Sequence, residues 1–187
     1  MVCLLVAAGL TAAFLVRART GPAAPPGYPS TIGASGKPVT PSAASRKLGI
    51  ASLQLIGTRG NRAFYRGSDA DNHPCLGAGD ASNLGTVGFT LCSRDERPLI
   101  ASDPVIAVPD VQMTEGSGRW QLVRLDGFAA DSVARVTATD SAGVVVAEAQ
   151  VVDNVFSIVP ATAVEPGTIK AYDRNGKLVF SHDYSGG

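Results

Sequence analysis

The sequence predicts an all-β protein built as an antiparallel β-sandwich, with an apolar helix and a proline-rich tether at its N-terminus. Three observations lead to this prediction. After Ser45 the chain consists of short apolar runs separated by turn residues at intervals of roughly ten, which is typical of a sandwich. Small and β-branched residues are abundant, and Gly alone occupies 21 of the 187 positions. No run in the second half repeats its apolar residues at helical spacing.

The first element is the uncharged run VCLLVAAGLTAAFLV from Val2 to Val16, which Arg17 and Arg19 follow directly. A helix needs roughly 20 apolar residues to cross a bilayer, so this run suits a signal peptide or the end of a longer anchor. The basic pair follows the run instead of preceding it, and by the positive-inside rule alone Arg17 would be cytoplasmic. We expect residues 1–19 to be a signal peptide or membrane anchor whose start lacks a few basic residues. The alternative is a buried helix of a soluble protein.

The second element is a linker, residues 20–45, rich in Pro, Gly, Ser and Ala, which predicts an extended and solvated tether. The balance of charged side chains changes close to the end of this linker. Up to Lys47 the chain has five Lys or Arg and no Asp or Glu, whereas the remainder has 11 basic and 16 acidic residues, a balance of −5. A folded part with this balance repels phosphate backbones, so we expect no nucleic-acid partner.

The third element is a β-rich domain, residues 46–187, which begins with two predicted hairpins in residues 46–103. SLQLIG and RAFYRG flank the sequence TRGN, in which Gly60 and Asn61 can take positive φ and close the first hairpin. CLGAGD and GFTLC predict the second, because glycines at 77, 79, 85 and 88 permit a sharp return.

Residues 104–187 predict further strands and two more hairpins, residues 133–151 and 168–182. Each hairpin has the plan strand, Asp, two residues, Gly, strand, and we interpret Asp140 and Asp173 as turn formers. We expect the pairs Asp126-Gly127 and Asp131-Ser132 to bracket another turn. VARVTATD and VVVAEAQV alternate with period two, which predicts half-buried strands. The apolar face of the second holds Val145, Ala147, Ala149 and Val151. The predicted core aromatics are Trp120, Phe128, Phe156 and Phe180.

Five stretches follow one another in this domain: RAFYRGSD, CLGAGD returning to GFTLC, RLDGFAADSVARVTATDSAG, VVDNVFSI and IKAYDRNGKLV. In this succession the chain, over residues 48–182, resembles a group of uncharacterised secreted or membrane-anchored proteins of high-GC Gram-positive bacteria. Its second half is similar to bacterial immunoglobulin-like or prealbumin-like modules. The resemblance implies an immunoglobulin-like sandwich in residues 104–187 and a place outside the cytoplasm. It implies no catalytic residue, because the shared motifs are structural.

The stretch NHPCLGAGDASNLGTVGFTLC, residues 72–92, holds both cysteines outside the N-terminal run and one of the two histidines. Cys75 and Cys92 each lie on or beside a predicted strand, and the glycines between them let the chain return. In an oxidising compartment a bridge between them would stabilise the fold by about 3 kcal/mol on the loop-entropy model. We therefore expect a Cys75–Cys92 disulfide, with Cys3 unpaired.

Two other interpretations of these cysteines stay open. A zinc site needs four ligands, and His73, Cys75, Cys92 and His182 could supply them. A thiol nucleophile would use Cys75 with His73 as its base, although Pro74 between them restricts that geometry.

A calcium loop is a further alternative for the residues just before and within this stretch. Of Asp69, Asp71, Asn72 and Asp80, the three Asp residues place carboxylates at the first, third and twelfth positions of such a loop. The pattern fails at His73 and Pro74, which replace an oxygen ligand and the invariant Gly, and no flanking helices are predicted.

The sequence thus predicts a non-enzymatic binding or structural module outside the cytoplasm. No Gly-rich loop precedes a helix and no Ser, His and Asp set has supporting context, so we expect no catalytic residue, cofactor or metal. The expected location is the cell membrane, as a single-pass protein with an extracytoplasmic C-terminal domain, or secretion. The partners would be the membrane, through the N-terminal segment, and a protein or cell-envelope component. The alternative functions are a sensory ectodomain of a regulatory membrane protein and a hydrolase.

Overall fold

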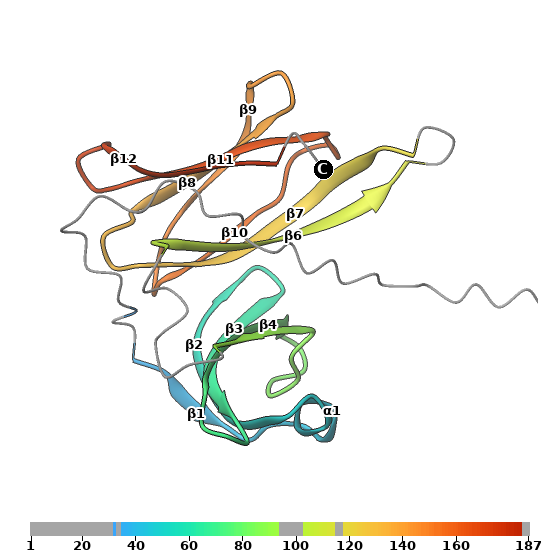
Figure 1. Cartoon of the computed structure of the whole chain (residues 1–187), viewed down its shortest axis with the longest axis vertical. Helices are drawn as coiled ribbons and strands as arrows, with labels where there is room; N and C mark the ends of the chain where they lie inside the picture. The colour runs from blue at the N-terminus through green and yellow to red at the C-terminus, as the bar shows by residue number, and fades with distance from the viewer. Residues whose placement is uncertain (1–31, 33–34, 94–102, 115–117, 185–187) are drawn as a thin grey trace, which may run out of the picture.

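The structure is a computed structural model that describes residues 32, 35–93, 103–114 and 118–184. Strands dominate these residues, and every pairing between the strands is antiparallel. The strands form three sheets, one N-terminal and two that pack against each other (Figure 1). The all-β antiparallel fold expected from the sequence is confirmed.

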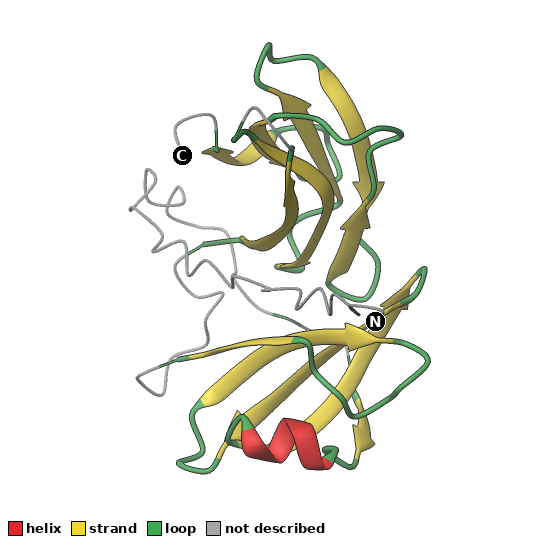
Figure 2. Ribbon diagram, turned by 90° about the vertical axis from the view of Figure 1, so that its right-hand side faces the viewer, coloured by secondary structure: helices red, strands yellow, loops and turns green. Residues whose placement is uncertain are grey.

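The first sheet, called the N-terminal sheet below, has five strands in sequence order and one short helix. It contains β1 (Lys37–Val39), α1 (Ala43–Lys47), β2 (Ile50–Arg59), β3 (Arg62–Asp69), β4 (Pro74–Asp80) and β5 (Phe89–Cys92). The sheet is strongly curled, and α1 lies at the end away from the other sheets (Figure 1, Figure 2). The last residues of the segment expected to be a linker therefore belong to β1 and α1.

Successive side chains along β3 and β4 point to opposite faces of the N-terminal sheet, and apolar side chains occur on both faces. Ala63, Tyr65 and Cys75 point to the concave side, where they form one buried cluster with residues of β2 and Val87. Phe64 and Leu76 point to the opposite side and pack on residues of the second half of the chain. Tyr65 and Phe64 are both fully buried although they are neighbours, which requires that both faces of β3 be covered.

The other two sheets share one core and are together called the sandwich below. The three-stranded sheet has the order β10 (Val155–Ile158), β7 (Trp120–Ala129), β6 (Val105–Met113). The four-stranded sheet has the order β12 (Leu178–Asp183), β11 (Pro166–Tyr172), β8 (Arg135–Asp140), β9 (Val145–Gln150). Leu125 and Phe156 of the first sheet are buried in one cluster with Val136 and Ala171 of the second. The chain passes between the two sheets three times, at β7–β8, β9–β10 and β10–β11.

The predicted turn chemistry is confirmed at both hairpins of the four-stranded sheet. Asp140 Oδ1 accepts from the backbone N–H groups of Ala142 and Val144, at 3.0 and 2.9 Å. Asp173 Oδ1 accepts from those of Asn175 and Lys177, both at 2.9 Å. The following glycines, at 143 and 176, have φ of 82° and 78°, which a Cβ would disfavour.

The β2–β3 hairpin is also present, but its turn differs in one detail. Gly60 has φ 55°, as expected, whereas Asn61 is not among the described residues of positive φ. The glycine alone therefore supplies the left-handed conformation at this turn.

The core prediction is right for Phe128 and Phe156, which are fully buried, and wrong for Trp120. Trp120 pairs with Met113 at the outer end of the β6–β7 ribbon, and the two side chains are 38% and 58% exposed. Val145 is 56% exposed, so the expected apolar face of β9 is only partly covered. β9 is an edge strand with a register shift at its start, and Val145 therefore lies beyond the core. Phe180 is half-buried against the core.

A buried ion pair connects the N-terminal sheet to the sandwich. Arg62 Nε donates to Asp126 Oδ2 at 2.6 Å, and Ser157 Oγ donates to Asp126 Oδ1 at 2.6 Å. Asp126 is 1% exposed. The rings of Phe64 and Phe128 meet edge to face beside this network, with centroids 5.6 Å apart. The two parts of the chain thus share apolar and charged contacts.

The connection between β4 and β5 packs closely on the backbone of Gly79, and we expect Gly79→Ala to be destabilising. A Cβ there would overlap the carbonyl oxygen of Thr86. The overlap should lower the free energy of unfolding by about 1–3 kcal/mol, measured by urea denaturation. Gly88→Ala is the matched control, because its Cβ would meet nothing nearer than the Ala78 oxygen at 3.6 Å. Equal stability of the two variants would contradict the expectation.

Several expectations lie outside the described residues: the apolar helix in residues 1–19, most of the linker, and Cys3. Among the residues that the structure describes, no helix is long and apolar enough to span a membrane.

Candidate functional site

The pairing of β4 with β5 sets Cys75 directly opposite Cys92. The two residues form a disulfide with an S–S distance of 2.00 Å and a Cα–Cα distance of 4.0 Å, so the expected pair is present in the structure. Cys75 is 3% exposed and belongs to the concave cluster of the N-terminal sheet, whereas Cys92 is half-buried. β5 is a four-residue edge strand, and the disulfide holds its last residue.

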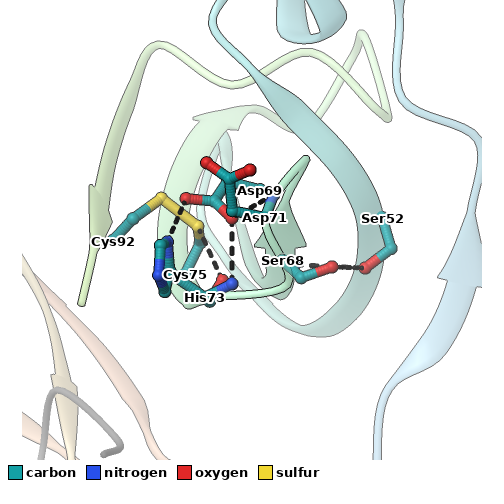
Figure 3. Close-up of a disulfide and its surroundings, with 7 residues drawn as sticks. All are labelled: Ser52, Ser68, Asp69, Asp71, His73, Cys75 and Cys92. Atoms are coloured by element: carbon teal, nitrogen blue, oxygen red, sulfur yellow. Dashed lines mark hydrogen bonds and ion pairs between the residues drawn. A yellow bond between two sulfur atoms is a disulfide. The ribbon is translucent and has the colours of Figure 1, made fainter. Parts of the chain in front are cut away.

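The turn between β3 and β4 is organised by the carboxylate of Asp69, beside the disulfide (Figure 3). Asp69 Oδ1 accepts from the backbone N–H groups of Asp71 and His73, both at 2.9 Å. Asp69 Oδ2 lies 3.0 Å from His73 Nδ1. Asn72, in the same turn, has φ 64°, a conformation that Asn tolerates better than most residues. The local sequence therefore uses one Asp to fix both the backbone and the imidazole.

These bonds act on the pKa of Asp69. Partial desolvation raises the pKa, but the hydrogen bonds from the backbone and ring of His73 and from the backbone of Asp71 outweigh it. The pKa is therefore held below its usual range. A carboxyl group whose pKa is lower in the folded than in the unfolded chain stabilises the fold above its unfolded pKa, near pH 4.

We expect the free energy of unfolding of Asp69→Asn to fall less steeply than that of the wild type as the pH is lowered through the acid range. The wild type should exceed the variant in stability at pH 7, and the difference should shrink as the pH falls below about 4 and the carboxylate is protonated. Urea denaturation of both proteins at pH 7 and at pH 3 measures this difference in free energy of unfolding. Asp71→Asn removes a neighbouring carboxylate that makes none of the three hydrogen bonds and serves as control. A difference between wild type and Asp69→Asn that stays constant with pH would contradict this interpretation.

Asp69 also belongs to two groups of potential metal ligands. Its carboxylate oxygen and the sulfurs of Cys75 and Cys92 all lie within 4.8 Å of one another. Ligand atoms of Asp69, Asp71 and His73 satisfy the same limit. The sequence had not suggested Asp69 as a neighbour of the cysteines, because this proximity depends on the register of β3, β4 and β5.

The zinc set expected from the sequence is brought together only in part. His73, Cys75 and Cys92 lie in one region of the N-terminal sheet (Figure 3), but His182 belongs to β12, an edge strand of the sandwich. Its ring lies between those of Phe180 and Tyr184, with centroid distances of 6.4 and 4.5 Å. The four-ligand set that includes His182 is therefore wrong.

The structure also contradicts the nucleophile interpretation and the calcium interpretation. The sulfur of Cys75 is bonded to that of Cys92 and is no thiolate in this state. Asp80 pairs with Arg62 at the opposite end of the β3–β4 hairpin from Asp69, and it accepts hydrogen bonds from Ser82. The calcium set is wrong because its first and twelfth residues lie at opposite ends of the paired strands β3 and β4.

Asp126 is the polar residue that sequence reasoning misplaced. With Gly127 it was expected in a turn, but it lies within β7, buried and paired with Arg62. Gly127 faces Phe156, whose ring occupies the space of a Cβ. A carboxylate inside the apolar run RWQLVRLDGF was the available signal, because a buried charge in a strand requires a partner.

A hollow lies at one end of the sandwich, where the β7–β8, β9–β10 and β11–β12 connections meet. Its volume is about 320 Å³, and it is open to solvent. The lining residues are Ala130, Asp131, Val133, Val151, Asp153, Asn154 and Arg174. Asn154 Nδ2 donates to Asp131 Oδ1 at 2.7 Å and to the Ala129 oxygen at 3.0 Å, which ties two of the connections together. Its exposed lining is mainly polar and carries charges of both signs, from Asp131, Asp153 and Arg174.

We find no significant match to the chain among protein-family models, curated proteins or solved structures.

Proposed function

We propose that the chain is a non-enzymatic binding or structural module outside the cytoplasm, tethered at the cell surface by residues 1–19 and a linker. The disulfide between Cys75 and Cys92 is the observation that carries this proposal. Disulfides form and persist in oxidising compartments and are rare in the cytosol. The proposed partners are the membrane, for the N-terminal segment, and a protein or cell-envelope component for the β-rich domain.

Strand order supports the finer assignment of the sandwich as immunoglobulin-like. One sheet has three strands in the order β6, β7, β10, and the other has four in the order β12, β11, β8, β9. If the seven strands are read as A, B, C, C′, E, F and G, these are sheets A-B-E and G-F-C-C′. Sandwiches of this kind present their connecting loops at two ends, and binding to them uses those loops.

The hollow at the end of the sandwich supports binding over catalysis. Three connections that are distant in sequence line it, and Asn154 fixes two of them by hydrogen bonds. Its polar groups are held by their neighbours, as a recognition surface requires. A nucleic-acid partner is disfavoured by the acidic balance of the folded part.

Protease treatment of intact cells of the native host, with the chain carrying a C-terminal epitope, tests the location. We expect the epitope to be removed from intact cells, or to be found in the medium. Thiol alkylation under denaturing conditions should label Cys75 and Cys92 only after reduction. A variant lacking residues 2–16 is the control, and its epitope should be protected until the cells are lysed. Protection of the full-length chain, with both thiols free, would overturn the proposal.

A further inference from the structure

The disulfide lies beside groups that have no obvious use in holding it. A carboxylate oxygen of Asp69 is within 4.8 Å of both sulfurs, and Asp69 Oδ2 lies 3.0 Å from His73 Nδ1. His73 is held in turn through its backbone, because its N–H donates to Asp69 and its carbonyl oxygen lies 3.5 Å from Cys75 Sγ. Asp69 is thus shared by two sets of potential ligand atoms, one with both sulfurs and one with the His73 imidazole, and these residues lie together at one end of β4 (Figure 3).

We propose that the chain with its disulfide reduced binds one Zn²⁺ through Cys75, Cys92, Asp69 and His73. Two thiolates, an imidazole and a carboxylate are all ligands that zinc accepts in four-coordinate sites. The thiolates exclude calcium and magnesium as the preferred ions, because those cations require oxygen ligands. The site goes beyond the proposed function, since it concerns a state that the chain passes through before its thiols are oxidised.

Ligand atoms of three of the four residues, Asp69, Cys75 and Cys92, already lie within 4.8 Å of one another, whereas the His73 imidazole lies beside Asp69 and would have to turn toward the sulfurs. In tetrahedral zinc sites, metal–ligand distances of about 2.0–2.3 Å separate neighbouring ligand atoms by about 3.3–3.8 Å. In the reduced chain the two sulfurs can reach this separation by side-chain rotation. The carboxylate, within 4.8 Å of the sulfurs, would move inward. Register between β4 and β5 keeps the cysteines opposite each other in both states.

The zinc-bound and disulfide states would exclude each other. A phosphine or a dithiol reduces the S–S bond by two electrons; the two thiols then lose their protons as Zn²⁺ binds the thiolates. In the reverse direction an acceptor disulfide takes two electrons and two protons to become a dithiol. The Cys75–Cys92 bond forms and Zn²⁺ is released. In a reducing compartment zinc would thus hold the edge strand β5 in the place that the disulfide holds after oxidation.

Zinc titration of the full chain carrying Cys3→Ser tests the proposal, with the protein either oxidised or reduced by a phosphine. We expect one Zn²⁺ per reduced chain and at least tenfold weaker binding by the oxidised chain. Asp69→Asn and His73→Gln should each weaken binding to the reduced chain about tenfold or more. Co²⁺ in place of zinc should give the thiolate-to-cobalt charge-transfer absorption, which the Cys75→Ser/Cys92→Ser variant should lack. Asp71→Asn and His182→Gln are matched controls and should bind as tightly as the parent.

Two results would overturn the assignment. Equal binding by the oxidised chain would place the metal on Asp69, Asp71 and His73, without the sulfurs. Unchanged affinity in both Asp69→Asn and His73→Gln would mean that the thiols bind zinc adventitiously. If reduction unfolds the chain, far-ultraviolet circular dichroism provides the second measurement. Zinc should then restore the β-sheet signal of the parent but not of Asp69→Asn, and failure to restore the parent would equally reject the site.

Discussion

Arg62→Met is expected to lower the free energy of unfolding by about 3 kcal/mol or more, because it isolates a buried carboxylate. The Asp126 side chain is 2% exposed in the parent, and the substitution removes its cation while Ser157 can still donate to it. Removing one member of a buried ion pair typically costs about 3–5 kcal/mol, because the remaining charge stays desolvated. The lower end applies because the Arg62 side chain retains 23% of its exposure.

Urea denaturation at neutral pH measures this effect, and two further variants interpret it. Arg66→Met is the matched control on the same strand, because Arg66 Nε donates to the neutral Gln54 amide at 2.9 Å; we expect a loss of about 1 kcal/mol or less. In the Arg62→Met/Asp126→Leu variant both charges are absent, so stability should return toward that of the parent. A double variant as unstable as Arg62→Met alone would show that loss of packing, not the unpaired charge, causes the effect.

The ion pair also bears on how the two parts of the chain act together. Asp126 lies in β7 of the sandwich, and Arg62 opens β3 of the N-terminal sheet. Phe64 and Phe128 meet beside them in a shared apolar cluster. Loss of the pair should therefore reduce the cooperativity of unfolding as well as the stability, because fewer contacts then couple the sheet to the sandwich.

Local turn chemistry made the hairpins predictable from the sequence. At Asp140 and Asp173 the turn depends on a carboxylate that bonds to backbone two and four residues ahead, and on a glycine within reach of it. Such determinants lie within five residues of one another and need no tertiary contact. The Cys75–Cys92 pairing was likewise available, because the short return between two apolar runs brings the cysteines together.

The features that could not be predicted from the sequence depend on strand register and on contacts between sheets. Asp69 lies near the sulfurs only because β3, β4 and β5 are aligned as they are, and a shift of one residue would turn its side chain away. Asp126 is 64 residues from Arg62, and no local pattern connects them. Trp120 has the size and the strand context of a core residue, but its strand extends past the sheet that would have covered it.

Removing the disulfide is the second change with a large expected effect. The Cys75→Ala/Cys92→Ala variant should lose about 2–5 kcal/mol in free energy of unfolding, because the unfolded chain regains the freedom of the loop that the bridge closes. The sequence separation of 17 residues corresponds to about 3 kcal/mol on the loop-entropy model. Replacing Cys75 also removes a side chain that is 3% exposed in the concave cluster.

The loss should be concentrated at β5, which has only four residues and pairs with β4 alone. Hydrogen exchange should therefore show faster exchange in β4 and β5 than in the parent, while β7 and β8 in the sandwich stay protected. Cys3→Ser, which leaves the bridge intact, is the control. Reduction of the parent in the presence of a chelator should lower the stability and speed the exchange of β5 as the double variant does. The loss should be smaller only by the packing of the Cys75 side chain, which reduction leaves in place. If neither reduction nor substitution changes the stability or the exchange of β5, then strand pairing alone holds that edge. The disulfide would then be dispensable for stability. It would still indicate an oxidising compartment, because disulfides persist only where thiols are not kept reduced.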